Sequence, residues 1–414
     1  MSSFLSRPFG RVVPALLAGT LLWLAMACGR QEAPAPDPIT MEWSAIETAA
    51  RGQAVTMAMW MGDPYINSYM RDYVAVELEK RYGVRLNIVG AQGGQIVSAI
   101  MTEKEAGTAT GAYDLVWING ETFYQLRQIE GLYGPFTEKL PNAAYIDFDN
   151  PFIGIDFQQP IDGYECPWGN VQMALIYNSE RVAEPPRTRA ALAEWVAAHP
   201  GRFTFDSSFT GMTLLKSWMI DLAGGPEHLA GPFSEERYRE HSAKLWAFVN
   251  EIKPNFWREG RSFPSSVAQM HQMFANGELD FTMSNNDGEV DNKVLQGLFP
   301  ETARAFVFEG GTIQNSHYLG IVANAPNKAG ALTVINFMIS PEAQLEKQDP
   351  AIWGDGTVLA LDRLPQPWPE RFLSLPNRRF APPRAEIQDK ALMELAPEYM
   401  IRLYDDFRRE VLGE

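Results

Sequence analysis

Short apolar runs alternate with amphipathic stretches near the start of the folded chain, and this alternation limits the fold more than any other feature. Val55–Met61 is a continuous apolar run, as expected for a strand buried on both faces. Ile66–Tyr82 carries one apolar helical stripe and closes at a glycine, and Val84–Val89 and Asp114–Ile118 are predicted as two further strands. This strand–helix–strand order predicts a parallel sheet with right-handed crossovers, and hence an α/β fold.

Polar side chains and glycines follow two of these strands where they end. Trp60-Met61-Gly62-Asp63 comes after the first strand, and Asn119-Gly120-Glu121 comes after the third. Ligands of open parallel sheets bind at the carboxyl ends of the strands, where a glycine lets the backbone approach them closely. Two structural explanations stay open, because the indole can fill the core and the glutamate can stabilise a helix N-terminus. The candidate ligand-binding residues at these ends are Trp60, Asp63, Asn119 and Glu121.

The stretch "YECPWGNVQMALIYNS", Tyr164–Ser179, has a split character. Its second half is an apolar strand, whereas its first half contains a thiol, a proline, an indole and a glycine. The α/β pattern then restarts with a helix over Thr188–His199, a strand over Phe203–Asp206 and a helix opened by Thr210-Gly211. A later strand, Leu279–Ser284, ends in Asn285-Asn286-Asp287-Gly288. Two α/β units predict two lobes around a cleft, and we interpret Tyr164–Ser179 as the first strand that crosses between them.

The N-terminus has the features of a secretory signal with a lipid-attachment site. Arg7 and Arg11 precede the apolar stretch Val12–Ala27, which is too short for a comfortable membrane span, although an uncleaved anchor helix is the alternative. Small residues before Cys28 resemble the lipobox of bacterial lipoproteins. We therefore expect a signal peptide over 1–27, and a lipid anchor and flexible tether over 28–50. The expected location is the periplasm, with the body anchored to a membrane through lipid on Cys28.

The charge of the chain excludes several kinds of partner. The formal net charge is −16, and removal of the signal, with two arginines and no acid, would make it −18. Such a surface disfavours nucleic acid and anionic membranes. The acidity either favours a cationic ligand or only maintains solubility.

At this point the motifs carry a family resemblance. The strings "PWGNVQMALIYNS" and "GTIQNSHYLGIVANAPNKAGALTVINFMISPEAQ" resemble periplasmic solute-binding proteins of bacterial ABC importers. The strings "YDLVWINGETFYQL", "GLYGPFTEKLPN", "FTGMTLLKSWMI", "FWREGRSFPSS" and "DPAIWGDGTVL" are similar to the YnjB-type group, which is associated in general with thiamine transport. The resemblance runs from about Val55 to about Leu364.

The resemblance implies a type II periplasmic binding protein fold, with two α/β lobes joined by crossing strands around a cleft. The expected boundaries are 51–165 plus 310–350 for lobe 1, 166–309 for lobe 2, and 351–414 for a C-terminal helical segment. The implied partners are a small solute, an ABC permease and its ATPase, with the protein acting as a monomer and without a cofactor. The residues implied to face the cleft are Trp60, Asn119, Trp168, Asn170, Thr210, Asn286, His317 and Tyr318.

One turn departs from the pattern expected for the group. Where Asn-Pro-Ala is expected after the Leu279–Ser284 strand, this chain has Asn286-Asp287-Gly288-Glu289. The two added carboxylates either favour a more cationic solute, with Asp287 as a further ligand-binding residue, or form a solvated acidic turn.

The residues favour binding over catalysis. The sequence lacks the G-x-S-x-G nucleophile motif, the H-E-x-x-H zinc motif, the Walker phosphate-binding loop and the dinucleotide-binding fingerprint. Its five histidines have no metal-ligand spacing. Cys166 stands beside an acid, which disfavours a reactive thiolate, so we expect an inert, partly buried thiol. Aromatic faces at Trp60, Trp168 and Tyr318 could instead hold a flat or cationic ring by stacking. A small polar or cationic organic solute, with thiamine as one possibility, fits these residues, while a lipid-anchored scaffold or lipid carrier is the alternative and a hydrolase is less favoured.

Two expectations concern the last third of the chain. Ala331–Ile339 has core spacing, and Ser340-Pro341 should cap a new helix. Glu386–Leu412 is predicted as an amphipathic helical brace, with Asp405-Asp406 on its solvated face.

Overall fold

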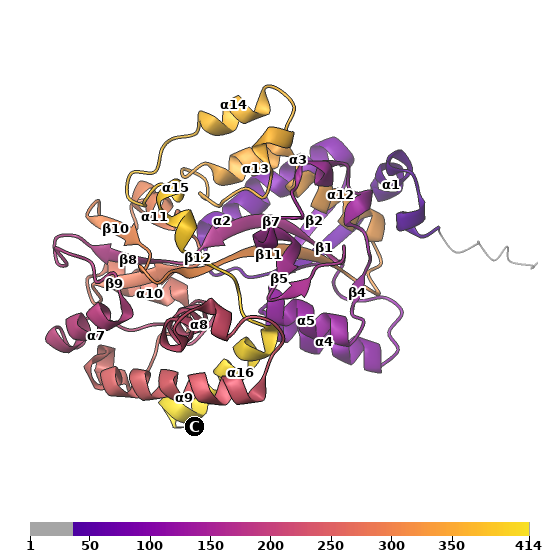
Figure 1. Ribbon diagram of the computed structural model, residues 1–414. Helices are drawn as coiled ribbons and strands as arrows, with labels where there is room; N and C mark the ends of the chain where they lie inside the picture. Colours follow the sequence, from indigo (N-terminus) through magenta and orange to yellow (C-terminus); the bar gives the residue numbers. More distant parts are fainter. Residues whose placement is uncertain (1–35, 414) are drawn as a thin grey trace, which may run out of the picture.

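The computed structural model describes residues 36–413, and the predicted signal and Cys28 lie outside this range (Figure 1). The predicted parallel unit is present. Strand β1 (Ala54–Met59) pairs in parallel with β2 (Arg85–Gly90) on one side and with β3 (Leu115–Ile118) on the other. The carboxyl ends of β1 and β3 therefore lie at the same edge of the sheet, as the sequence predicted.

The predicted helix over Ile66–Tyr82 forms one continuous helical path with a change of pitch. It runs through α2 (Pro64–Ser68), a π-helical segment (Tyr69–Val74) and α3 (Ala75–Tyr82). Gly83 ends it with a left-handed φ of +65°, a conformation that glycine adopts without penalty. The second crossover, between β2 and β3, is α4 (Gly93–Glu105).

A long antiparallel strand completes the first sheet. β11 (Thr312–Val322) lies between β3 and the short β12 (Ala391–Leu392), which gives the order β12-β11-β3-β1-β2. Two further strands, β4 (Leu132–Tyr133) and β7 (Glu165–Gln172), also pair with β11.

The second sheet is smaller and antiparallel. Its order is β10-β8-β9, from β10 (Ala303–Phe306), β8 (Ala174–Asn178) and β9 (Phe281–Ser284). The strand predicted over Phe203–Asp206 is wrong, although the segment is buried and extended. Its neighbourhood makes isolated backbone hydrogen bonds, such as Trp257 N to Phe203 O at 2.8 Å, instead of a strand ladder.

The predicted crossing over Tyr164–Ser179 is confirmed. β7 belongs to the first sheet and β8 belongs to the second, so this stretch passes between them with one intervening residue, Met173. The Met173 amide donates to the Ile313 carbonyl on β11 at 2.8 Å. The passage thus lies at Met173, later than the predicted boundary at residue 166.

Two main hydrophobic cores define the lobes. The core of lobe 1 is built around β1, β3 and the helix α12, and includes Met57, Ile118 and Ile335. The core of lobe 2 is built around α8 and α9, and includes Trp218 and Val249. Figure 1 shows these two bodies on either side of the β7–β11 pair.

The remaining helices surround the two sheets. Thr188 caps α7 and Ser340 caps α13, each by accepting a hydrogen bond from a backbone amide three residues ahead, so both predicted helix starts are confirmed. None of the helices within 36–413 is long and apolar enough to cross a membrane. The bounds are α1 (Trp43–Ala50), α5 (Gly120–Gln128), α6 (Pro151–Gly154), α7 (Arg189–Ala198), α8 (Phe209–Ala223), α9 (Glu235–Ile252), α10 (Val267–Ala275), α11 (Glu289–Leu295), α12 (Lys328–Met338), α13 (Pro341–Gln348), α14 (Trp368–Leu373), α15 (Arg384–Ile387) and α16 (Pro397–Phe407).

The folded body begins earlier than the tether predicted over 28–50 allows. Helix α1 packs on α12 and buries Ile46 and Ala50 completely. The sequence pattern around Pro36 and Pro38 is that of a linker, but the residues from Trp43 onward already belong to lobe 1.

The brace predicted over Glu386–Leu412 is helical at both ends but interrupted over residues 391–396. After α15, a 3-10 turn (Gln388–Lys390) leads into β12, residues 393–396 have no regular secondary structure, and α16 follows, prolonged by a π-helical turn (Arg408–Leu412). Pro397 occupies the first turn of α16, where a missing amide is tolerated, and its ring would clash inside a continuous helix. We call residues 378–395 the C-terminal strap, because they contact both lobes before α16 begins.

The two neighbouring acids of α16 have opposite environments. Asp405 is exposed as predicted, but Asp406 is buried, which corrects the prediction of a solvated pair. The Asp406 carboxylate accepts a hydrogen bond from the Tyr238 hydroxyl of α9 at 2.7 Å and pairs with Arg409. It therefore fixes α16 to lobe 2.

This difference gives a matched pair of variants for testing how α16 is held. Asp406→Ala should lower the free energy of unfolding by about 1–3 kcal/mol, because it leaves the buried Tyr238 hydroxyl without its acceptor. Asp405→Ala should change it by less than about 0.5 kcal/mol, because exposed positions contribute little. Urea denaturation measures both values, and equal losses for the two variants would contradict the assigned role of Asp406.

Candidate functional site

The rim of lobe 1 is formed by the residues that follow β1 and β3. Trp60 is half-buried, and its ring folds over Gly62 so closely that a methyl group at Gly62 would overlap it. Asp63 caps α2, since its Oδ1 accepts from the Tyr65 amide at 2.8 Å and from the Ile66 amide at 3.1 Å. Asn119 is half-buried and precedes α5.

Glu121 lies in the first turn of α5 with one side-chain oxygen, Oε2, buried and without a hydrogen-bond partner among the described residues. Burial raises the pKa of Glu121 to about 7, with the nearby Lys216 ammonium acting in the opposite direction. An acid that only stabilises a helix N-terminus is normally solvated and hydrogen-bonded. That role, which the sequence left open, therefore does not by itself explain the buried, unpaired oxygen of Glu121.

The rim of lobe 2 is formed by the start of α8 and by the turn after β9. Thr210 is buried in the first turn of α8, where its hydroxyl accepts a hydrogen bond from Asn285 Nδ2 at 3.1 Å. Asn285 is half-buried and keeps its Oδ1 unpaired within the described part of the chain. Asn286 donates from Nδ2 to the Gly354 carbonyl at 3.3 Å.

A circuit of contacts connects these two rims. The Phe157 ring packs against Gly120 and lies 6.4 Å from the ring of Phe209, which precedes Thr210. On the other side, Asn286 donates a hydrogen bond to Gly354. The preceding residue, Trp353, has its ring centroid 6.1 Å from that of Trp117 on β3. We call the region inside this circuit the interlobe seam: residues 60–63 and 117–121 of lobe 1 opposite residues 208–210 and 285–289 of lobe 2.

An ion pair joins the lobes across the seam. Lys293 of α11 pairs with Asp63 of lobe 1 and lies 3.1 Å from Glu289 of its own helix. Burial opposes the charge on Lys293, but Glu289 and Asp63 outweigh it and raise the pKa of this lysine. Both oxygens of Asp63 thus have protein partners, one on the cap of α2 and one on Lys293.

A cluster of aromatic rings lies beside the seam, at the crossing strands. The rings of Trp117, Trp168, His317 and Trp353 have neighbouring centroids 5.0–6.1 Å apart. Trp168 is completely buried, so the structure leaves it no free face for stacking on a solute. Its Nε1 has no hydrogen-bond partner among residues 36–413. Trp117, which the sequence analysis did not single out, is half-buried.

The odd composition of the crossing strand is explained by this cluster. His317 on β11 lies 3.0 Å from the Asp355 carboxylate, and the buried Lys347 pairs with the same carboxylate. Burial alone would raise the pKa of Asp355, but the facing His317 and Lys347 hold it below its usual value. A methyl group at Gly169 would overlap both the His317 ring and the Asp355 carboxylate. The glycine of the predicted crossing strand therefore makes room for side chains of the protein itself.

Two of the predicted contacts are occupied by the protein. The Tyr318 ring is completely buried in the core of lobe 1, and its hydroxyl donates to the Ile153 carbonyl at 2.9 Å. Asn170 is buried and has all its groups engaged, for example Nδ2 with Ser316 Oγ at 3.0 Å and Oδ1 with Gln314 Nε2 at 2.8 Å. Neither side chain offers a free group in this arrangement, because the protein already supplies their hydrogen-bond partners.

The acidic turn is neutralised and does not face solvent. Asp287 is completely buried, and Arg384 lies 2.7 Å from one carboxylate oxygen while Arg378 pairs with the other. Burial works against the charge, but the two guanidinium groups outweigh it and hold the pKa of Asp287 far below its usual value. Glu289 likewise pairs with Lys293 and accepts from Ser284. The turn thus fixes the C-terminal strap to lobe 2, and the prediction of a solvated turn is wrong.

The thiol of Cys166 and the metal-ligating side chains were the two remaining chemical features of the sequence. Cys166 is completely buried, more than predicted, and burial raises the pKa of its thiol. No three His, Cys, Asp or Glu side chains within 36–413 are grouped to hold a metal ion.

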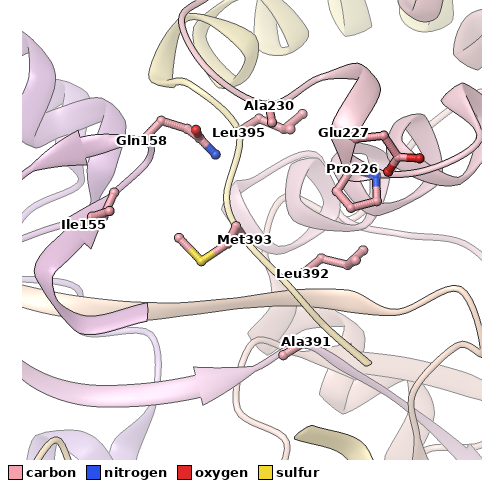
Figure 2. Close-up of a pocket in the computed structure, with 9 residues that line it drawn as sticks. All are labelled: Ile155, Gln158, Pro226, Glu227, Ala230, Ala391, Leu392, Met393 and Leu395. Atoms are coloured by element: carbon pink, nitrogen blue, oxygen red, sulfur yellow. The ribbon is translucent and has the colours of Figure 1, made fainter. Parts of the chain in front are cut away.

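A separate groove lies at the lower junction of the lobes (Figure 2). It has a volume of about 520 Å³, and mostly aliphatic side chains line it. Figure 2 shows Ile155 and Gln158 on one side, Pro226 and Glu227 on the other, and the C-terminal strap running between them.

Comparison with known proteins places the chain in a family. Residues 74–358 match the family model of the bacterial extracellular solute-binding proteins, and the chain belongs to that family. It is 36% identical to protein YnjB of Escherichia coli strain K12 over 365 residues, which cover 87% of this chain and 94% of that protein. The protein is therefore a bacterial extracellular solute-binding protein.

Solved structures share the fold at low sequence identity. The Tp0655 (TpPotD) lipoprotein of Treponema pallidum has a TM-score of 0.63 and 14% identity, with 87% of this chain and 100% of that chain covered. The periplasmic binding protein AfuA of Actinobacillus pleuropneumoniae has a TM-score of 0.62 and 13% identity, with 87% and 98% covered. The predicted type II periplasmic binding protein fold is confirmed.

The Gly169 contact can be tested with a matched glycine. Gly169→Ala should lower the free energy of unfolding by roughly 2 kcal/mol or more, because the added methyl group must displace His317 or Asp355 in a packed interior. Gly94 in α4 has no neighbour in the way of a methyl group, so Gly94→Ala should be neutral or stabilising by up to about 1 kcal/mol. Chemical denaturation compares the two, and a neutral Gly169→Ala would refute the close approach.

The buried carboxyl of Glu121 predicts a pH dependence of stability. Because its folded pKa of about 7 lies above the ordinary value of 4.5, the folded state binds the proton more tightly than the unfolded state does. The free energy of unfolding should therefore fall as the pH rises from about 4.5 to about 7, and Glu121 should contribute up to about 3 kcal/mol of that fall. Glu121→Gln should flatten this part of the curve.

The control for this experiment is the exposed Glu130, at 88% side-chain exposure. Glu130→Gln should leave the pH profile unchanged. Denaturation midpoints at several pH values between 4.5 and 7.5 provide the comparison, and parallel curves for Glu121→Gln and the parent would contradict the assignment.

Proposed function

We propose that the protein captures a small polar or cationic organic solute in the interlobe seam and delivers it to the permease of an ABC importer. The observation that carries this proposal is the convergence of polar groups from both lobes at the carboxyl ends of β1 and β3. Asn119 of lobe 1 adjoins Gly120 of the circuit, and the hydrogen-bonded Thr210 and Asn285 of lobe 2 adjoin Phe209 and Asn286 of the same circuit. Ligands of parallel α/β sheets bind at such ends.

The half-buried side chains of the seam favour a solute with a flat or cationic part. Trp60 and Trp117 keep part of their surface exposed, and an indole face attracts a cation by about 0.5–2 kcal/mol. The unpaired oxygens of Asn285 and Glu121 would accept hydrogen bonds from the solute. A closing lobe supplies the partners that a desolvated polar solute needs, so the correct solute stabilises the closed arrangement.

The charges of the seam favour a solute with a low charge. Asp63, Asp287 and Glu289 all have cationic partners within the protein, so they do not form a strongly acidic site. A cation that displaced Lys293 from Asp63 would gain one carboxylate. A thiamine-like cation belongs to this class of solutes, together with other singly charged amines.

The remaining parts of the proposal concern the setting of the protein. Lipid attachment at Cys28 would hold it at the membrane, and the residues before α1 would act as the tether. In this position a monomer would exchange solute with a permease and its ATPase.

A second candidate function is favoured by one observation. The groove beside Ile155 and Leu392 is mainly aliphatic, with a volume of about 520 Å³, in the range of small-molecule sites. An acyl chain would fit this lining better than a polar solute would. The lipid-carrier alternative therefore requires binding at the groove, and not at the seam.

A thermal-shift screen separates the two candidates. The ligands are thiamine, its phosphates, polyamines, quaternary amines and sugars, together with a fatty acid and a lysophospholipid. A seam ligand at 100 times its dissociation constant should add about 2.7 kcal/mol of stability, and Trp60→Ala should abolish this gain. Trp368→Ala, which removes a half-buried indole on α14, is the control and should keep it.

The opposite pattern would contradict the proposal. Stabilisation only by the acyl compounds, lost in Leu392→Gln and retained in Trp60→Ala, would assign the groove as the binding site. Stabilisation by none of these compounds, with a normally folded protein, would favour a scaffold role.

A further inference from the structure

The β5–β6 hairpin of lobe 1 reaches into lobe 2. It consists of β5 (Ile155–Asp156) and β6 (Gln159–Pro160), which pair directly on either side of Phe157-Gln158. Ile153 and Ile161, which flank the hairpin, belong to the core of lobe 1, whereas Phe157 is 1% exposed and belongs to the core of lobe 2. One aromatic ring at the tip thus crosses the boundary between the lobes.

Both lobes are shaped to accept this ring. On the lobe 1 side, Gly120 lies against it, and a methyl group there would overlap the ring. On the lobe 2 side, the Phe209 ring lies 6.4 Å away and the Lys216 ammonium lies 4.0 Å from the ring centroid. Lys216 is itself completely buried and pairs with Glu394 of the C-terminal strap.

The neighbouring Gln158 makes polar contacts with lobe 2 and with the C-terminal strap. Its Nε2 donates to the Glu394 carbonyl at 2.6 Å, and its Oε1 accepts from the Gly231 amide of lobe 2 at 3.1 Å. The tip is therefore joined to lobe 2 and to the strap by packing, a cation–ring contact and two hydrogen bonds.

The backbone of the tip is strained. Phe157 and Gln158 have φ values of +45° and +63°, the left-handed region that two-residue hairpins require and that glycine and asparagine favour. A phenylalanine persists in this conformation only where its surroundings hold it there. At the tip of the hairpin the chain therefore has a large ring, Phe157, where a small turn residue would relieve the strain.

We propose that the β5–β6 hairpin is an interlobe latch that holds the two lobes together in the solute-free protein. It does so by inserting the Phe157 ring between Gly120 of lobe 1 and Phe209 of lobe 2. Because Gly120 lies between Asn119 and Glu121, withdrawal of the ring would release the lobe 1 rim of the seam at the same time as it separated the lobes. The latch rests on the two-lobed arrangement and not on the identity of the solute.

The test is an interlobe distance measured without any solute. Met101 of α4 and Lys244 of α9 are both exposed, and each is replaced by a spin-labelled cysteine. Pulsed electron–electron double resonance between the two labels then reports the separation of lobes 1 and 2. The labels are introduced in the full chain carrying Cys28→Ser, in which the buried Cys166 is the remaining native cysteine. The parent should give one compact distance distribution.

Phe157→Gly should shift this distribution to longer distances by at least 5 Å or broaden it toward them, since it removes the ring and relieves the backbone strain together. Phe136→Ala removes an equally buried ring that lies wholly within the core of lobe 1, and it should leave the distance unchanged. A distribution for Phe157→Gly identical to that of the parent would overturn the latch, as would a parent that is already as open as the variant.

A second variant tests the contact between Gly120 and the Phe157 ring. Gly120→Ala should open the lobes by expelling the ring, and the same substitution should add nothing in a Phe157→Gly background, where no ring is present to clash. Equal and additive effects in the two backgrounds would contradict the contact. If Phe157→Gly does not fold, Gln158→Ala takes its place with a smaller shift of the same sign, and no shift there overturns the proposal.

Discussion

The antiparallel pairing of β7 with β11 is the constraint on which the rest of the structure depends. All eight residues of β7 are buried, and β11 binds β7, β3, β4 and β12 at once. Because β7 continues directly into the second sheet, this ladder fixes one end of each lobe, while side-chain contacts join their rims. The side chains of the ladder must satisfy the core of lobe 1, the contact with the C-terminal strap and the edge of the seam within one strand. That demand explains why Trp168, Gly169 and Asn170 stand together in a strand where valines would otherwise be expected.

Charge is handled within the protein. Three buried acids at the lobe junctions have cationic partners drawn from other parts of the chain, in Asp63–Lys293, Glu394–Lys216 and Asp287–Arg384, whereas Glu121 has none among the described residues. Each of these pairs joins two segments that are distant in sequence, and two of them involve the strap. Removal of one partner from such a pair leaves a buried charge, which is strongly destabilising, so the pairs specify how lobes and strap are placed.

The parallel unit, the crossing strand and the helix caps could be predicted because they depend on local patterns. Apolar periodicity identified β1 and β2, and Ser340-Pro341 marked the start of α13. The predictions failed where a residue's partner is distant in sequence. Nothing near Asp287 indicates that Arg378 and Arg384 neutralise it, and nothing near Gly120 indicates that Phe157 fills the adjoining space. The strand over Phe203–Asp206 was predicted from its apolar pattern, but strand pairing also needs a neighbouring strand, which the sequence does not specify.

The glycines that follow the strands show the same limit most clearly. Gly62 and Gly120 do permit close approach, as the sequence analysis expected, and so does Gly169 within β7, but the groups that approach are Trp60, Phe157 and His317 with Asp355. The seam is thus lined by side chains that the protein has packed against its own backbone. Trp60, Trp117, Asn119 and Asn285 are the half-buried side chains of the seam on which the proposed solute site depends.

Hydrogen–deuterium exchange with the most stabilising ligand of the screen tests the central claim most directly. If a solute binds in the seam, amides of residues 117–123 in lobe 1 and 208–214 in lobe 2 should gain protection together, because closure brings both rims onto the same molecule. Protection confined to residues 226–231 and 391–395 would place the ligand in the aliphatic groove, and protection on one lobe alone would show that the two rims do not close on a common solute.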